Sequence, residues 1–467
     1  MLKFTPAATA ALPAAFAQTS PASMAEPGVP ARMKSRDSKD IKASPISIGF
    51  ETLDRQMFDP ERTYAHLAKL GVKWARCQTG WARTETTKGK YDFDWLEKVV
   101  DSLLAIGIQP WFNLGYGNTL YTPGPEHPSA VGWIPMNSED AKAAWLRYVD
   151  ALATKFATRV KHWEIWNEPN ISNFWQPDKP DPVKYVEFAK MTAPTLRRRV
   201  PGATLIGGVI AGFPNLDYTE GMLNAGLADI VDRISYHPYR AVPELGYDSD
   251  MRAFRGLLNR YKPGMKIWQG ENGAPSTNNS TGALREFEWD EARQAKWLLR
   301  RLVTDFSMDV EVSSYFQTVD MQNYIWSSGN SGMTNSKGVL RGGVYTPKAS
   351  YYALQNLCSV LDSEAKRADL YVRADNVPAG LDPIAVRTAS FLKNGVPLYL
   401  WWYPSNLQKG FESGHKIRLS TWAGKAGKIS KPVLCDLVSG DVWPAPASSA
   451  MPLRDYPMLL TDVSLIS

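Results

Sequence analysis

Cysteine and histidine are scarce in this chain of 467 residues, which contains three Cys and five His. Cys77, Cys358 and Cys435 lie far apart, are odd in number and lack metal-ligand spacing. We therefore expect buried free thiols rather than a disulfide framework or a structural zinc site. No two histidines have the spacing of metal ligands either. The sequence thus gives no support to a metal-dependent hydrolase, and we expect no metal.

Long apolar runs and dense basic runs are missing as well. After the N-terminus, no stretch is apolar for long enough to span a bilayer, so no membrane partner is expected. The net charge is +6, but the Lys and Arg residues are scattered and no nucleic-acid-binding module is recognisable. No nucleic-acid partner is expected, and the oligomeric state stays open.

The overall composition is that of a globular protein, with 44% hydrophobic and 21% charged residues. The N-terminus departs from it. Met1-Leu2-Lys3, an Ala-rich stretch and Ala15-Phe16-Ala17 predict a signal peptide over 1–17 and a secreted or periplasmic protein. The alternative is an Ala- and Pro-rich tail without targeting value. Residues 18–44 are predicted to form a linker or an extended N-terminal segment.

From about residue 45, a short apolar strand, a loop and an amphipathic helix follow one another repeatedly. Strands such as 108–112 and 204–209 are apolar on both faces, which is typical of a parallel sheet. Eight strands are predicted, near 45–52, 72–78, 108–114, 160–167, 203–210, 231–236, 265–271 and 310–316. Eight such units over 45–362 favour an α/β fold, a closed (β/α)₈ TIM barrel. A doubly wound open sheet is the alternative, but no Gly-rich phosphate-binding sequence follows the first strand.

Helix signals lie between these strands. One helix is predicted from Asp59-Pro60 to Gly71, another begins at Asp94, a third carries an apolar stripe over 145–156, and the last covers about 345–362. The pattern then changes to short strands between turns, near 370–372, 384–386, 396–403, 417–419 and 433–435. Residues 363–467 are therefore predicted to form an accessory β-sandwich without a catalytic constellation.

Two carboxylates are placed for chemistry, because catalytic groups of such barrels lie at the C-terminal ends of strands. Glu168 ends the apolar alternation of the fourth strand, just before Pro169, and Glu271 ends the seventh strand. Glu164 lies deeper in the fourth strand and is expected to be structural. Two carboxylates on one rim suit glycoside hydrolysis, in which one holds a proton and the other stays ionised.

Trp166-Asn167-Glu168-Pro169 on the fourth strand, together with Gly270-Glu271 on the seventh, resembles clan A of the glycoside hydrolases. Ser235-Tyr236-His237-Pro238-Tyr239 after the sixth strand and the C-terminal β domain make the chain most similar to family 39, over roughly 45–467. The resemblance implies a retaining β-glycosidase that acts on oligo- or polysaccharides by double displacement. Glu168 would be the acid/base and Glu271 the nucleophile, and no cofactor would be needed.

The resemblance also implies substrate-binding roles. Asn167 would bind the sugar 2-hydroxyl, and Arg76 would keep Glu271 ionised. His237 and Tyr239 match positions that contact the nucleophile and the sugar. From the residues alone, aromatic and amide side chains near strand ends and in loops are further candidates for sugar contacts: Trp81, Trp111, Tyr116, Trp133, Trp175, Trp326, Gln269, Gln317 and Asn323.

Other hypotheses remain open from the sequence. A carbohydrate-binding barrel without catalysis would share the fold, although both carboxylates and Arg76 are present. An endo-acting exopolysaccharide hydrolase is the alternative to an exo-glycosidase. The sugar, the linkage and any transglycosylation are left undecided by these motifs.

Overall fold

The structure is a computed structural model that describes residues 30–213, 215–326, 329–330, 332–412 and 414–466. The predicted signal peptide at 1–17 and the first part of the predicted linker, 18–29, lie outside the described residues and stay predictions.

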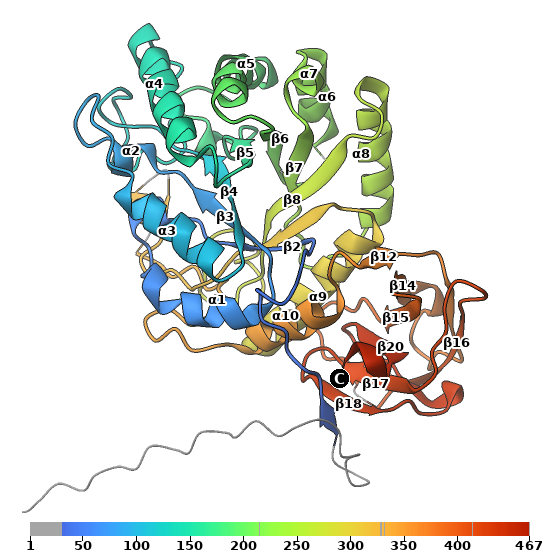
Figure 1. Ribbon diagram of the computed structural model, residues 1–467. Helices are drawn as coiled ribbons and strands as arrows, with labels where there is room; N and C mark the ends of the chain where they lie inside the picture. Colours follow the sequence, from blue (N-terminus) through green and yellow to red (C-terminus); the bar gives the residue numbers. More distant parts are fainter. Residues whose placement is uncertain (1–29, 214, 327–328, 331, 413, 467) are drawn as a thin grey trace, which may run out of the picture.

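Eight parallel strands close into a barrel, as Figure 1 shows, and the predicted (β/α)₈ fold is confirmed. The strands are β2 (Ile46–Gly49), β3 (Trp74–Gln78), β4 (Gln109–Leu114), β5 (His162–Ile165), β6 (Thr204–Ala211), β7 (Arg233–His237), β8 (Lys266–Asn272) and β9 (Val312–Tyr315). Alternate residues of each strand face opposite sides. Trp111 and Trp268 pack together with Ile206 and Val312, while Ala75, Cys77 and Phe112 belong to the separate core shared with the helices.

Helices surround the barrel in Figure 1. They are α1 (Tyr64–Leu70), α2 (Trp81–Thr84), α3 (Asp94–Ala105), α4 (Glu139–Phe156), α5 (Pro182–Arg199), α6 (Leu216–Asn224), α7 (Leu227–Ile230), α8 (Tyr247–Tyr261), α9 (Glu291–Ser307) and α10 (Ala349–Val360). Asp59 accepts a hydrogen bond from the Glu61 amide as predicted for a cap, but the turn it caps is a 3₁₀ helix, Pro60–Arg62, that precedes α1. In the part of the chain that the structure describes, no helix is long and apolar enough to cross a membrane.

Residues 30–44 are the described part of the predicted linker, and they pack firmly on the protein. Strand β1 (Ala31–Arg32) pairs with β18 (Asp441–Pro444). Ile41 is fully buried, and Arg36 Nη1 lies 2.6 Å from Asp362 Oδ2. Of the two forms expected for this segment, residues 30–44 have that of an extended N-terminal segment rather than that of a linker. A composition rich in Pro and Ser did not reveal that other parts of the chain supply partners for this segment.

The C-terminal residues form two antiparallel sheets that enclose a second core, which is the predicted β-sandwich. The larger sheet has the order β1-β18-β17-β20-β15-β14-β12 and the smaller one the order β13-β16-β19. Their further strands are β12 (Ala365–Arg367), β13 (Tyr371–Asp375), β14 (Arg387–Lys393), β15 (Val396–Trp402), β16 (Lys416–Trp422), β17 (Pro432–Asp436), β19 (Met451–Pro452) and β20 (Met458–Asp462). The strand expected at 384–386 is instead a 3₁₀ turn, Pro383–Ala385, whose first turn Asp382 caps. The three cysteines are buried and free, as predicted.

Strand β15 joins the sandwich to the barrel, because both of its faces are buried. Tyr399 and Trp401 point into the core between the two sheets, whereas Trp402 belongs to the core shared with the barrel. Trp402 Nε1 donates to Glu244 Oε1 at 2.7 Å, and Glu244 also accepts from Arg300 on α9 at 2.7 Å and 2.9 Å. The packed Trp402 indole, hydrogen-bonded to the Glu244–Arg300 ion pair of the barrel, therefore holds the accessory domain beside α9 and α10 (Figure 1).

We expect Trp402→Ala to lower the free energy of unfolding by about 3 kcal/mol or more, since it opens a large cavity and removes a donor from Glu244. The measurement is thermal unfolding followed by calorimetry. Trp422→Ala is the matched control, because Trp422 is 71% exposed and its loss is expected to change stability by about 0.5 kcal/mol or less. Equal losses in the two variants would contradict this account of the domain junction.

Candidate active site

Glu168 and Glu271 face each other at the C-terminal rim of the barrel. One carboxylate oxygen of each and a ring nitrogen of His237 all lie within 4.8 Å of one another. Irregular backbone directs both glutamates. Glu168, just beyond β5, has a φ of 46° and its amide donates to Val209 O at 3.0 Å. In β8 the register shifts between Gln269 and Asn272, a bulge that surrounds Glu271.

Arg76 on β3 is fully buried beneath the two glutamates and holds several side chains at once. Its Nη1 donates to Glu271 Oε2 at 2.9 Å, and its Nη2 donates to Asn167 Oδ1 at 2.8 Å. Its Nε donates to Glu164 Oε2 at 2.8 Å. Burial alone would lower the pKa of Arg76, but Glu164, Glu51 and Glu271 raise it above its usual value. The guanidinium therefore stays charged.

Glu271 is surrounded by donors. Besides Arg76, Tyr239 donates its hydroxyl hydrogen to Glu271 Oε1 at 2.7 Å. Burial by itself would raise the pKa of this carboxyl group, but His237, Arg76 and Tyr239 together outweigh burial and lower it. Glu271 is thus held as a carboxylate, the form that a nucleophile needs.

Glu168 has the opposite electrostatic environment. Burial raises its pKa, and the nearby charge of Glu271 raises it further, against the lowering effects of His237 and Arg76. His237 Nδ1 lies 2.7 Å from Glu168 Oε1 and 4.0 Å from Glu271 Oε2. The two facing carboxyl groups therefore have pKa values that are displaced in opposite directions.

Three polar residues of this region were missed by sequence analysis. Glu51 follows β2 and its Oε1 lies 3.2 Å from Arg76 Nη1. Asn113 on β4 donates to Glu164 Oε2 at 2.9 Å. Lys337 donates to Thr281 O at 3.0 Å, and burial lowers its pKa to about 7. Glu51 and Asn113 do occupy C-terminal strand ends, which was a usable signal, but neither stands in a recognisable motif. Lys337 carried no such sequence signal, because it lies in a long loop.

Aromatic side chains and a second arginine form a wall near the site. Arg55 lies 5.7 Å from the ring centroid of Tyr116 and 5.9 Å from that of Tyr324. The half-buried Trp326 of β10 (Ile325–Trp326) lies beyond Tyr324, with their ring centroids 6.3 Å apart. Trp326 is thus placed near the site, and its contact with a sugar stays a prediction.

Trp81 and Gln269 were predicted to contact substrate; both side chains are fully buried, and their contact with a sugar stays a prediction. Trp81 stacks between Tyr121 and Tyr148, with centroid distances of 5.4 Å and 5.6 Å. Gln269 donates inside the barrel to Ser313 Oγ at 3.0 Å and to Ser314 O at 3.1 Å. Among the other candidates, the following are also buried: Trp111, Tyr116, Trp175 and Gln317. Trp133 is half-buried and Asn323 is exposed.

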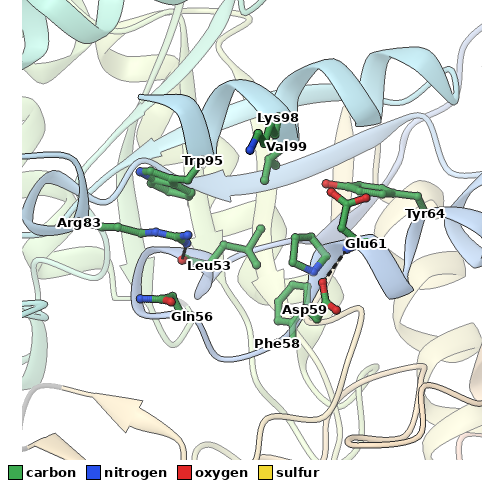
Figure 2. Close-up of a pocket in the computed structure, with 11 residues that line it drawn as sticks. Leu53, Gln56, Phe58, Asp59, Glu61, Tyr64, Arg83, Trp95, Lys98 and Val99 are labelled. Atoms are coloured by element: carbon green, nitrogen blue, oxygen red, sulfur yellow. Dashed lines mark hydrogen bonds between the residues drawn. The ribbon is translucent and has the colours of Figure 1, made fainter. Parts of the chain in front are cut away.

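A surface cavity of about 470 Å³ lies beside the site rather than in it, and Figure 2 shows its lining. Arg83 crosses this cavity, donates to the carbonyl of Leu53 and lies 4.2 Å from the ring centroid of Trp95. Leu53 and Arg55 belong to one short 3₁₀ helix. The charged and aromatic groups of the cavity therefore brace the segment that presents Arg55 to the wall of the site.

Among the described residues, Glu168, His237 and Glu271 are the group whose ligand atoms are close enough to hold a metal ion. Most of these atoms are already engaged, since Glu168 Oε1 is hydrogen-bonded to His237 Nδ1 and Glu271 accepts from Arg76 and Tyr239. The buried charge of Arg76 would also repel a cation. The donor set fits hydrogen-bonded carboxyl chemistry better than metal binding.

The structure is thus an eight-stranded (β/α)₈ barrel that carries two carboxyl groups of opposite pKa displacement on its C-terminal rim. Comparison with known proteins shows which family of such barrels it resembles. Residues 61–251 match the model of glycosyl hydrolases family 39, a stretch that includes Arg76, Glu168 and His237 but ends before Glu271. Over this stretch, which is less than half of its length, the chain resembles family 39 of the glycoside hydrolases.

Curated relatives match only part of this chain. A β-xylosidase from Geobacillus stearothermophilus is 28% identical over 159 residues, which cover 32% of this chain and 31% of the relative. A β-xylosidase from Caldicellulosiruptor saccharolyticus is 23% identical over 293 residues, 57% of this chain and 56% of the relative. The matched stretches thus span about a third to a half of these relatives.

The fold is shared more widely than the sequence. A family 39 glycoside hydrolase from the gut symbiont Bacteroides cellulosilyticus WH2 superposes with a TM-score of 0.66 at 20% identity, over 92% of this chain and 82% of that chain. A monomeric β-xylosidase from Caulobacter crescentus CB15 superposes with a TM-score of 0.58 at 16% identity, over 92% and 97%.

We expect neither a chelator nor added zinc, magnesium or calcium to change the thermal unfolding midpoint of the purified protein. The physical reason is that Glu168 Oε1, His237 Nδ1 and both carboxylate oxygens of Glu271 are hydrogen-bonded, and that Glu271 lies beside the charged Arg76. The midpoint is measured after dialysis against EDTA and again after adding each ion. A rise with one ion in the parent that is absent from His237→Ala would show that the cluster binds metal.

Proposed function

We propose that the protein is a retaining glycoside hydrolase that cleaves β-glycosidic bonds of oligo- or polysaccharides by double displacement. One observation carries this proposal. Two carboxyl groups at the barrel rim have oxygens within 4.8 Å of each other, and their pKa values are displaced in opposite directions. Retaining glycosidases need two carboxyl groups about 5–5.5 Å apart, whereas inverting enzymes need room for a water between them.

In the proposed reaction, Glu168 is the acid/base and Glu271 the nucleophile. A carboxylate oxygen of Glu271 attacks the anomeric carbon while the glycosidic C–O bond breaks, and Glu168 gives its proton to the departing oxygen. Glu168 then takes a proton from water, whose oxygen displaces Glu271 from the glycosyl-enzyme. Two displacements at one carbon restore its original configuration.

The neighbours of the two glutamates support these roles. Arg76 and Tyr239 keep a hydrogen bond on each oxygen of Glu271. Arg76 also donates a hydrogen bond to the side-chain oxygen of Asn167 and so orients its amide group. We propose that Asn167 binds the sugar 2-hydroxyl. Such bonds strengthen as charge develops at the sugar in the transition state.

The names of the relatives suggest where to look for the substrate. Two of those that match are β-xylosidases and two are β-glucosidases, one of them from Phanerodontia chrysosporium and 29% identical over 109 residues. We therefore propose β-xylosides and β-glucosides as the first substrates to test, followed by oligosaccharides and extracellular polysaccharides. An exo-glycosidase releases single sugars from chain ends, whereas an endo-acting enzyme shortens polymers internally, so product length separates the two.

We expect the parent protein to hydrolyse at least one member of an aryl-glycoside and oligosaccharide panel, and Glu271→Gln to hydrolyse none of them. The amide cannot form the glycosyl-enzyme, so the rate is expected to fall by about 10⁴-fold or more. Sugar release is followed by chromatography, with the anomer of the first product identified by NMR. Binding of sugars without turnover by the parent would instead support a carbohydrate-binding barrel.

We expect kcat/KM to follow a bell-shaped pH profile. Activity rises as Glu271, whose pKa is lowered, loses its proton, and falls as Glu168, whose pKa is raised, loses its own. Glu168→Gln should abolish the alkaline limb and lower activity by about 10²–10⁴-fold on substrates with poor leaving groups. The loss should be much smaller for an activated aryl glycoside, which needs little protonation. Equal losses of activity on both kinds of substrate would show that Glu168 is not the general acid.

A further inference from the structure

Buried acidic groups outnumber the buried cations around Arg76. Glu51, Glu164 and Glu271 all contact this one guanidinium, and Glu168 lies just beyond it against His237. Arg76, Glu51 and Glu164 each have no more than 1% of their surface exposed. A buried carboxylate without a full counter-charge is unfavourable, and such a group takes up a proton instead. The site therefore requires at least one proton besides the one proposed for Glu168.

Glu51 is the carboxyl group with the weakest hold on the arginine. Glu164 accepts from Arg76 at 2.5 Å and 2.8 Å and from Asn113 at 2.9 Å. Glu271 accepts from Arg76 and Tyr239. Glu51 accepts a single hydrogen bond from another side chain, that of Arg76 Nη1 at 3.2 Å, and its Oε2 is buried without a hydrogen-bond partner among the described residues. Burial, reinforced by Glu271 and opposed by Arg76, raises the pKa of Glu51 to about 8.

The backbone leaves a space that this carboxyl group fills. Gly49 lies opposite Arg76 in the register of β2 and β3, so a side chain at position 49 would also point into the barrel. A Cβ atom there would collide with Glu51 Oε2 and would lie 3.1 Å from Gln317 Cβ. The absence of a side chain at Gly49 thus allows the Glu51 carboxyl group to lie beside Arg76.

We propose that Glu51 is a protonated positioning residue, which holds Arg76 Nη1 against Glu271 by hydrogen bonding without competing for the charge of the arginine. This inference rests on the proposed function, because its effect is exerted through the nucleophile. When Glu51 loses its proton, the new carboxylate attracts the same Nη1 and repels Glu271. The titratable groups that act on Glu51 from neighbouring strands and loops are Arg76, Cys77, Tyr239 and Glu271, and Glu164 shares Arg76 with it.

The first test is the pH dependence of stability and needs no substrate. Because the folded-state pKa of Glu51 lies above its usual value, its contribution to stability is complete at low pH and is lost as pH rises towards about 8. Glu51→Gln cannot lose a proton. The unfolding midpoint of Glu51→Gln minus that of the parent should therefore increase between about pH 5 and about pH 8.5.

The exposed Glu126→Gln is the matched control, and its difference from the parent should not follow this course. A flat or falling difference for Glu51→Gln would overturn the inference, since it would mean that Glu51 is ionised in the folded protein throughout. A midpoint difference that falls with pH in both Glu51→Gln and Glu126→Gln would also overturn the inference, because the expected rise is specific to position 51.

The second test uses the substrate identified for the parent. Glu51→Gln keeps an oxygen that can accept from Arg76, whereas Glu51→Ala removes it, so the alanine variant should have the lower kcat/KM by about 10-fold or more. The ratio of Glu51→Gln to parent activity should rise with pH above about 7 as the parent loses the proton. Equal losses in the two variants, or a ratio independent of pH, would overturn the positioning role.

The two tests separate failure of this inference from failure of the proposed function. If the parent cleaves nothing in the panel, the positioning role falls together with the glycosidase proposal. If the parent is active but the stability difference is flat, the glycosidase proposal stands and Glu51 is not the proton carrier.

Discussion

The charge of Arg76, buried inside the barrel, is the interaction on which the site depends. Removing a guanidinium from water is costly unless carboxylates compensate it, and here Glu164 and the proposed nucleophile Glu271 do so. The planar fork of the guanidinium also fixes directions, since separate N–H groups reach Glu164, Asn167 and Glu271. A single side chain therefore sets both the charge balance and the geometry of the rim.

The backbone is regular where the barrel is packed and irregular where the site lies. Glu168 has a positive φ, Val209 on β6 has one as well, and β8 is bulged before Asn272. Such conformations are unfavourable for residues with side chains and persist only where surrounding structure enforces them. Here they turn the two glutamates towards each other, which a continued regular strand would not do.

The sequence by itself determined the architecture and the pair of glutamates. Apolar strands alternating with amphipathic helices permit a parallel sheet buried on both faces, and eight repeats close it. Strand ends are marked locally, by Pro169 after Glu168 and by the glycines that flank Glu271. Because all parallel strands end on one rim, local signals were enough to bring distant residues together. The change to short strands after residue 362 likewise revealed the accessory sandwich.

Only the tertiary structure decided which other side chains reach the site. Trp81 and Gln269 sit in suitable strand-end sequences, yet packing against Tyr121 and Tyr148 or hydrogen bonding inside the barrel occupies them. Glu51 carries no motif, and its importance comes from sharing Arg76 with residues far along the chain. Burial and charge balance are sums over many distant neighbours. A sequence pattern reports which face a residue points to, but not what already fills the space there.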